Sequence, residues 1–247
     1  TIANQASGTL TLSHTNVLCN GACDGTATAT MAGGNPPFTY EWDDPASQTT
    51  QTAVDLCPGL YQVSVIDAVG CLVKDTVSIY EPTVITNYFA ISDPLCNGSC
   101  DGTATLNPNG GTPGYSFLWD DGQTNSTATG LCSGIHAVTI TDANGCTYET
   151  DTTLTDPLAM TIAGTLTDAN CGQADGAIDL EITNGTGPYS ISWDNGASSE
   201  DLIDIVAGTY CVTVTDVNGC TVSDCYNISD LTGPAATITG STNVSCF

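Results

Sequence analysis

Cysteine and aspartate are the residues whose types and spacing could do chemistry in this chain. It contains 13 cysteines among 247 residues. Two pairs have the spacing of one half of a zinc site, namely Cys19 with Cys23 and Cys96 with Cys100. The remaining cysteines stand alone and supply no second half, and so many thiols in an acidic chain are typical of an oxidising compartment. We therefore expect disulfides rather than zinc.

The charge of the chain excludes several classes of partner. It has 27 acidic side chains and one cationic side chain, Lys74, which gives a formal net charge of −26. Nucleic acids and anionic membrane surfaces are excluded, because both are bound through Lys and Arg side chains. Insertion into a membrane is not expected either, since no apolar run approaches the roughly 18 residues that a spanning helix needs.

The sequence repeats itself with a period of about 75 residues. LCNGACDGTATAT from Leu18 returns as LCNGSCDGTATLN from Leu95, and Cys171 opens a third copy. TNVSC, which ends at Cys246, repeats TNVLC, which ends at Cys19, so we expect the chain to be part of a longer array. The predicted domains are residues 1–81, 82–156 and 157–233, with 234–247 as the start of a fourth repeat.

Each repeat predicts short β-strands rather than helices. Apolar and polar residues alternate, as in PFTYEWDD from Pro37, and β-branched residues dominate. Asn-Gly at Asn144 and at Asn218 supplies the positive φ angles of a tight hairpin. Six or seven such strands fit a small antiparallel sandwich of the immunoglobulin-like kind. We therefore predict an all-β chain of tandem sandwiches, arranged end to end because the junctions lack flexible linkers.

Catalytic activity is not expected. No G-x-S-x-G, H-E-x-x-H or P-loop motif is present, and the histidines do not recur at matching positions of the repeats. Tyr61 and Tyr210 occupy the place of a tyrosine corner, the tyrosine that caps one end of many such sandwiches. His136 stands at that place in the second repeat, so we interpret it as a core substitution.

The motifs resemble a known family. C-N-G-x-C-D-G-x-A, followed by G-G-x-P-x-Y-x-x-x-W and L-C-x-G-x-Y-x-V-x-V-x-D-x-x-G-C, resembles the SprB-type repeat of very large surface adhesins in gliding and surface-colonising Bacteroidota. The resemblance covers all three repeats, although Ala174 and Val206 replace two cysteines in the third. It implies a secreted, cell-surface protein that is exported by the type IX route and serves adhesion or gliding motility.

Our leading hypothesis is a non-catalytic stalk or fibre of disulfide-stapled sandwiches within an extracellular adhesin. One alternative is an array of carbohydrate- or calcium-binding modules, and another is a subunit of a self-assembling extracellular filament. The expected partners are neighbouring repeats, other copies of the chain, or a surface polysaccharide or other extracellular ligand. The tryptophans alternate with other aromatic residues on one face, which favours burial and hence the stalk (Trp42, Trp119, Trp193).

Aspartates recur in the turns and are candidate calcium ligands, because calcium prefers oxygen ligands. Such aspartates also accept hydrogen bonds from their own turns, and no EF-hand loop is present, so we favour the turn role and predict no other cofactor. The candidates are Asp24, Asp101 and Asp175 in the C-D-G turn, and Asp67, Asp142 and Asp216 before the hairpin turn.

Two threonines are candidate sites of O-glycosylation. Thr76 in Asp-Thr-Val and Thr152 in Asp-Thr-Thr resemble the Asp-Ser/Thr-apolar acceptor of Bacteroidota. Both lie in the predicted last strand of a repeat, where a sugar would keep an edge strand from pairing with another chain.

The third repeat indicates how the cysteines pair. Ala174 and Val206 replace the counterparts of Cys23 and Cys57, and two cysteines that are lost together are expected to be partners. Cys211 and Cys225 flank a hairpin and form a replacement pair. Cys246 is left for a further repeat. The predicted pairs are Cys19 with Cys71, Cys23 with Cys57, Cys96 with Cys146, Cys100 with Cys132, Cys171 with Cys220, and Cys211 with Cys225.

Overall fold

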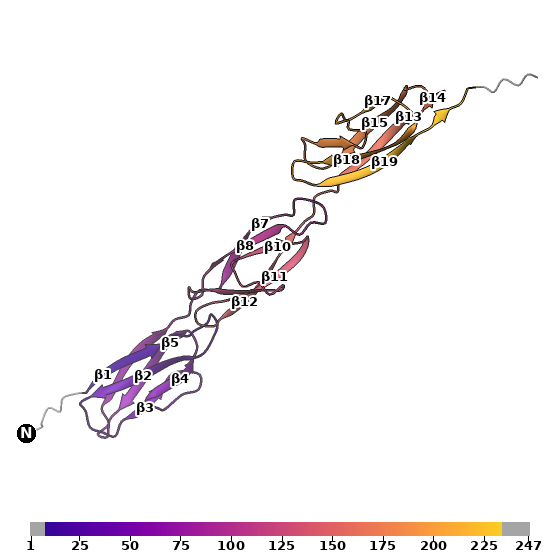
Figure 1. Cartoon of the computed structure of the whole chain (residues 1–247). Helices are drawn as coiled ribbons and strands as arrows, with labels where there is room; N and C mark the ends of the chain where they lie inside the picture. The colour runs from indigo at the N-terminus through magenta and orange to yellow at the C-terminus, as the bar shows by residue number, and fades with distance from the viewer. Residues whose placement is uncertain (1–7, 234–247) are drawn as a thin grey trace, which may run out of the picture. The chain divides into compact units, whose positions relative to one another are not determined.

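The computed structural model describes residues 8–233, and this part of the chain is built from β-strands without a helix (Figure 1). The chain divides into two compact units. The first unit holds the residues up to 90 together with 104–128 and 135–152, and the second unit holds residues 91–103, 129–134 and those from 153 onward. The junction of the first two repeats thus lies within the first unit, and the next junction lies within the second. The described residues contain no helix that could cross a membrane.

The first repeat is a sandwich of two antiparallel three-stranded sheets. One sheet has the order β1-β2-β4 and the other has the order β3-β5-β6. The strands are β1 (Thr9–Thr15), β2 (Gly25–Ala32), β3 (Thr39–Trp42), β4 (Thr52–Leu56), β5 (Gly59–Ile66) and β6 (Leu72–Ile79). This order is that of the ABE and CFG sheets of an immunoglobulin-like sandwich.

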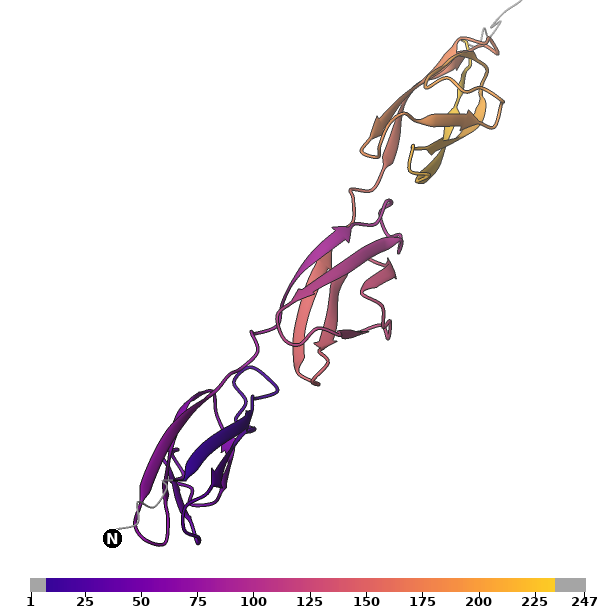
Figure 2. The ribbon, with the colours of Figure 1, turned by 90° about the vertical axis from the view of Figure 1, so that its left-hand side faces the viewer.

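The second and third repeats have the same strand order as the first. Figures 1 and 2 show their strands in two layers. The second consists of β7 (Thr86–Ser92), β8 (Gly102–Asn109), β9 (Ser116–Trp119), β10 (Thr127–Leu131), β11 (Gly134–Thr141) and β12 (Thr147–Leu154). The third consists of β13 (Thr161–Thr167), β15 (Gly176–Thr183), β16 (Ser190–Trp193), β17 (Leu202–Ile205), β18 (Gly208–Thr215) and β19 (Thr221–Ile228), with a short parallel pair of β14 (Ala169–Asn170) and β20 (Asp230–Leu231). The predicted fold class, tandem immunoglobulin-like sandwiches, is confirmed.

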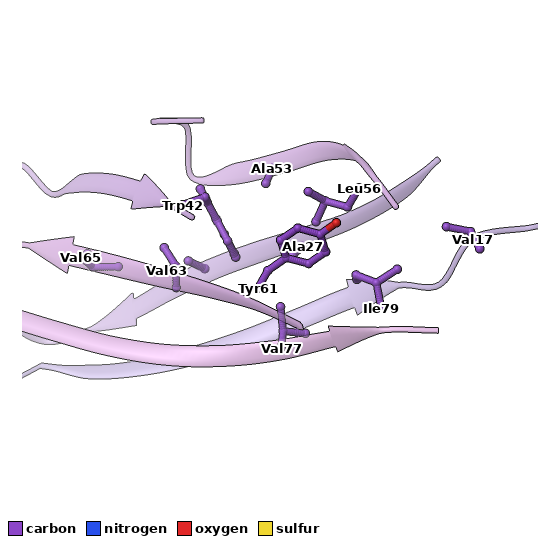
Figure 3. Close-up of a cluster of buried hydrophobic side chains, with 11 residues drawn as sticks. Val17, Ala27, Trp42, Ala53, Leu56, Tyr61, Val63, Val65, Val77 and Ile79 are labelled. Carbon is purple, nitrogen blue, oxygen red and sulfur yellow. The ribbon is translucent and has the colours of Figure 1, made fainter. Parts of the chain in front are cut away.

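The core of the first repeat pairs large side chains of one sheet with small ones of the other. Trp42 and Tyr61 extend from the β3-β5-β6 sheet, and Ala27 and Ala53 face them from the other sheet (Figure 3). Burial alternates along β2 and along β5, as the period of two requires. The indole N–H of Trp42 donates to the carbonyl of Thr50 at 3.0 Å, so the buried ring has no unpaired donor.

The tyrosine corners are also confirmed. The Tyr61 hydroxyl donates to the carbonyl of Cys57, and the Tyr210 hydroxyl donates to that of Val206, each at 2.9 Å. His136 is half-buried on β11 of the second repeat. The two tyrosine hydrogen bonds tie β5 and β18 to the turns that precede these strands.

The third repeat has a different core from the first. Ile178 stands where the first repeat has Ala27, and Tyr226 stands where it has Val77. Gly164 replaces Leu12 and makes room, since a Cβ at Gly164 would lie 2.8 Å from the Tyr226 ring. Larger core residues thus accompany the repeat that lacks the Cys23–Cys57 type of disulfide.

Candidate functional site: the cysteine-linked junctions

Three disulfides lie inside single repeats, as predicted. Two of them join the loop after the first strand to the turn after the fourth strand: Cys23 with Cys57, and Cys100 with Cys132. The third joins Cys211 and Cys225, which are directly opposite each other on β18 and β19. The first two bonds join neighbouring strands at one end of a sheet, and the third joins the two strands of a hairpin.

Two further disulfides join consecutive repeats and correct the sequence-based pairing. Cys19 is bonded to Cys146, and Cys96 is bonded to Cys220, with Cα–Cα distances of 5.6 and 5.5 Å. The predicted pairs Cys19 with Cys71, Cys96 with Cys146, and Cys171 with Cys220 are therefore wrong. We call the cysteine in the loop after the first strand of a repeat its loop cysteine, and the cysteine in the hairpin before the last strand its hairpin cysteine. In both junction disulfides, the loop cysteine of one repeat bonds to the hairpin cysteine of the next.

The strand directions explain why a loop cysteine cannot reach the hairpin cysteine of its own repeat. Cys19 follows β1 at the end of the sandwich where β5 begins, whereas Cys71 lies in the β5–β6 hairpin at the other end. β5 has eight residues, which span roughly 24 Å at about 3.4 Å per residue. A disulfide needs Cα atoms within about 7 Å. The hairpin of the following repeat supplies the nearby cysteine instead.

An aspartate holds each hairpin cysteine in place. One oxygen of Asp142 accepts the backbone N–H groups of Asn144 and Cys146, both at 2.9 Å. The other oxygen accepts the N–H of Thr112 at 2.8 Å, from the loop between β8 and β9. Asp67 and Asp216 make the same set of bonds in the other repeats, and all three carboxylates are buried.

Hydrogen bonds lower the pKa of these three carboxylates. The N–H of Cys71 is the largest cause of the lowered pKa of Asp67, and the N–H of Thr186 is the largest for Asp216. Burial alone would raise the pKa of Asp142, but its bonds from Thr112, Cys146 and Asn144 together outweigh burial and lower it. The hairpin aspartates are therefore held in their charged form.

A second aspartate anchors each cysteine loop. Asp24 accepts the N–H of Leu18 at 3.1 Å, Asp101 accepts that of Leu95 at 3.1 Å, and Asp175 accepts that of Asn170 at 2.8 Å. The pKa of Asp101 is lowered chiefly by the Ser99 hydroxyl, and that of Asp175 chiefly by the Asn170 side chain. Asparagines tie the first two loops to the chain that leaves the repeat, because Asn20 and Asn97 donate to the carbonyls of Pro82 and Pro157.

The first junction contains direct contacts besides the disulfide. The Asn144 side chain donates to the carbonyl oxygen of Leu18 at 3.0 Å. The Sγ of Cys146 lies 3.4 Å from the same oxygen, and the Sγ of Cys220 lies 3.4 Å from the carbonyl oxygen of Leu95 at the second junction. The loop carbonyl before each loop cysteine thus faces the hairpin of the next repeat.

The calcium candidates use their oxygens as acceptors of N–H groups in the bonds given above. Within residues 8–233, no three His, Cys, Asp or Glu side chains gather closely enough to hold a metal ion. The carboxylates do not converge on one point, because the loop aspartates and the hairpin aspartates of one repeat lie at opposite ends of the sandwich. The arrangement is that of turn-closing residues.

The remaining candidate residues are placed by the sheets. Trp42, Trp119 and Trp193 are 1–3% exposed and lie in the cores. Thr76 is exposed on β6 and Thr152 is half-buried on β12, and both strands are sheet edges. Cys246 lies outside the described residues.

Comparison with known proteins adds the family. A model described as SprB repeat matches residues 6–47, 89–124 and 163–198. No curated protein matches the sequence.

Among solved structures, the chain is similar to Sidekick-1 immunoglobulin domains 1–5, with 13% identity, a TM-score of 0.36, and coverage of 94% of this chain and 60% of that one. It is also similar to the eight N-terminal immunoglobulin domains of Down Syndrome Cell Adhesion Molecule, with 11% identity, a TM-score of 0.36, and coverage of 93% and 44%. Domains 4–9 of the surface layer protein SbsC match with 15% identity, a TM-score of 0.29, and coverage of 92% and 48%.

The chain thus spans less than two thirds of those structures, and their TM-scores mark a loose likeness, so the fold rests on the strand order given above. The family match and the recurring cysteine loops, Asp-closed hairpins and buried tryptophans agree that the chain carries three SprB repeats.

Proposed function

We propose that this chain is a stalk segment of an extracellular surface adhesin and that its disulfides limit how far the stalk can be stretched. The observation that carries the proposal is the overlap of the two inter-repeat disulfides, because Cys96 lies inside the loop that Cys19 and Cys146 close. A pulling force therefore meets a covalent path that bypasses most of the chain.

The path through the second repeat is short. It runs back from Cys146 to Cys132 over 14 positions, crosses the disulfide to Cys100, and reaches Cys96 after 4 more. Cys19 and Cys220 are 201 positions apart along the chain, but the disulfides leave only these 18 positions of main chain between them. The longest stretch of that path is the single strand β11, which is already extended in the fold. Unfolding the second repeat would therefore add little length.

The location also belongs to the proposal. Five disulfides in the described chain require an oxidising compartment, which supports secretion. The SprB repeats support placement on the cell surface, with export by the type IX route and a role in adhesion or gliding. Labelling of intact, unpermeabilised cells by an antibody against the chain is the expected result, and labelling only after lysis would contradict it.

Ligand binding by an aromatic platform is less well supported. The three tryptophans are buried, so none offers an open ring face for a sugar. The carboxylate of Asp142 accepts three backbone N–H groups at the junction, so its oxygens are already engaged in closing the turn. A load-bearing role instead uses the disulfides that recur at both junctions.

Single-molecule pulling from the two ends tests the stalk role. In the oxidised chain the path comprises 18 positions from Thr1 to Cys19, 18 from Cys146 to Cys96, and 27 from Cys220 to Phe247. At 3.3–3.6 Å per residue we expect a final stretched length of about 220 Å, and about 850 Å after reduction. An oxidised chain that extends as far as the reduced chain would contradict the proposal.

Two double variants serve as a matched pair in this experiment. Cys100→Ser with Cys132→Ser opens a staple on the path. The shortest remaining path then runs over 4 positions from Cys19 to Cys23, crosses to Cys57 and reaches Cys96 after 39 more. This path is 25 positions longer, so the oxidised length should rise by about 85 Å. Cys211→Ser with Cys225→Ser opens a staple off the path, so the length should not change. Equal effects of the two variants would show that the load does not follow the disulfides.

A further inference from the structure

Cys71 and Cys171 are the two cysteines of the described chain that have no disulfide, and both are exposed. Cys71 is the hairpin cysteine of the first repeat, and Cys171 is the loop cysteine of the third. The other hairpin cysteines, Cys146 and Cys220, are each bonded to the loop cysteine of the preceding repeat. The two exposed thiols are thus complementary halves of a bond that the chain forms twice.

The hairpin of Cys71 already has the geometry of the bonded hairpins. Asp67 accepts the N–H of Cys71 at 2.8 Å and that of Val69 at 3.1 Å, as Asp142 does in the bonded hairpin of the second repeat. Gly70 has a φ of +89°, close to the +85° of Gly145. The turn therefore presents Cys71 as it presents Cys146, without needing a bond to shape it.

The staple spacing of the first repeat gives a second, independent indication. Cys71 is 14 positions after Cys57, and Cys23 is 4 positions after Cys19, with Cys23 bonded to Cys57. These are the spacings that form the short path of the second repeat between Cys146 and Cys96. In the first repeat, the same path is complete except for a partner of Cys71.

Aspartates anchor the loop of Cys171 as they anchor the bonded loops, although Cys171 itself has a φ of +48°. Asp175 accepts the N–H of Asn170, and Asp230 accepts the N–H of Gly172 at 2.9 Å, in the place where Glu81 accepts that of Gly21. The loop is one residue shorter than the loops of Cys19 and Cys96. Its thiol remains exposed at the end of the sandwich where the other loop cysteines bond.

We propose that Cys71 forms a disulfide with the loop cysteine of a further repeat of this kind and that Cys171 forms one with the hairpin cysteine of another. Each bond joins two thiols, which together lose two protons and two electrons to a small disulfide such as oxidised glutathione, giving two molecules of glutathione. The hairpin of Cys71 has Val69 where the second repeat has Asn144, so its junction lacks the Asn144-to-Leu18 type of hydrogen bond. The inference concerns the bond alone and stands or falls separately from the stalk role.

A tandem duplicate of the chain tests both halves at once. Residues 1–241 are followed by residues 15–247, so that the second TNVLC replaces TNVSC and the repeats stay in register. Three cysteines are replaced by serine: Cys71 in the first copy, and Cys171 and Cys246 in the second copy. The one remaining candidate pair is then Cys171 of the first copy and Cys71 of the second. After folding in a glutathione redox buffer, we expect neither remaining thiol to react with an alkylating reagent and peptide mapping to find Cys171 joined to Cys71.

A control and a second arm complete the test. Adding Cys71→Ser in the second copy should expose the Cys171 thiol to the reagent, which shows that the bond and not burial protects it. Two reactive thiols in the oxidised duplicate, or a bond from either cysteine to a different partner, would overturn the proposal. The single chain with Cys246→Ser tests whether the partner cysteine can come from a separate molecule. If it can, oxidation produces oligomers that are linked through Cys71 of one molecule and Cys171 of another.

Discussion

The backbone N–H of Cys146 donates to the carboxylate of Asp142 at 2.9 Å, so the residue that closes the β11–β12 hairpin also positions the cysteine that bonds to Cys19. The second oxygen of Asp142 reaches across to Thr112 and ties the hairpin to the neighbouring loop. One buried carboxylate thus connects the turn, the end of the sandwich and the junction. The stability of a repeat and the geometry of its link to the preceding repeat depend on the same side chain.

Replacing Asp142 tests this dual role. Asp142→Ala leaves the N–H groups of Thr112, Asn144 and Cys146 without their acceptor. We therefore expect the free energy of unfolding, measured by urea titration, to fall by about 1–3 kcal/mol. Asp151→Ala, on the exposed side of β12, removes the same charge and is the control. Equal stability of the two variants would mean that the hairpin does not need the carboxylate.

Acid should destabilise the repeats through the hairpin aspartates. Their folded-state pKa values are lowered, so their contribution is present above the ordinary Asp pKa of about 3.9 and is lost as the pH falls toward the folded values. Acidification also relieves the repulsion within a chain of net charge −26, which acts in the opposite direction. The informative measurement is therefore the difference in melting temperature between the chain and its Asp142→Asn variant. We expect it to shrink below pH 4, and a constant difference would contradict the lowered pKa.

The tyrosine corner should contribute through its hydroxyl. Tyr61→Phe removes the bond to the carbonyl of Cys57 while keeping the ring, so we expect a loss of about 1 kcal/mol in unfolding free energy. Tyr88→Phe, at a position that is 67% exposed, should have no measurable effect. A silent Tyr61→Phe variant would show that the Cys23–Cys57 disulfide alone fixes this turn.

Most of the fold could be predicted from the sequence because the same pattern of strands and turns occurs in all three repeats. Alternating apolar residues define the strands around Trp42 and its counterparts, and Asn-Gly at Asn144 and Asn218 marks the hairpins. The loss of two cysteines at Ala174 and Val206 identified the Cys23–Cys57 type of bond. That inference works because an unpaired partner would leave a free thiol.

The junction disulfides were missed because a comparison of repeats shows which cysteines vary together but not where they lie. The signal was present in the strand order. An antiparallel sandwich places the loop of Cys19 and the hairpin of Cys71 at opposite ends, which excludes a bond within the repeat. The hairpin aspartates were likewise identified as turn residues, but their contact with a distant loop, such as that of Asp142 with Thr112, has no counterpart in local sequence.

The buried tryptophans lead to a prediction about sugars. Trp119 is 2% exposed, and its indole N–H donates to the carbonyl of Asn125 at 2.9 Å. We expect oligosaccharides to leave the tryptophan fluorescence unchanged, and Trp119→Ala to cost about 3–5 kcal/mol of stability. A saturable fluorescence change on adding a glycan, lost in a folded Trp119→Phe variant, would instead support the carbohydrate-binding alternative.

Removal of calcium should leave the repeats intact. One oxygen of each loop aspartate, Asp24, Asp101 or Asp175, accepts a loop N–H group. Both oxygens of the hairpin aspartates are engaged, as in Asp142. A calcium ion bound there would have to displace these donors, each worth about 0.5–1.5 kcal/mol net. We therefore expect an excess of EDTA to leave the melting temperature unchanged at constant ionic strength. A ligand that binds only the folded state stabilises it by RT ln(1 + [L]/Kd), so its removal lowers the melting temperature. A fall in melting temperature with EDTA, restored by calcium but not by a potassium salt of equal ionic strength, would contradict the turn role and assign these aspartates to a cation.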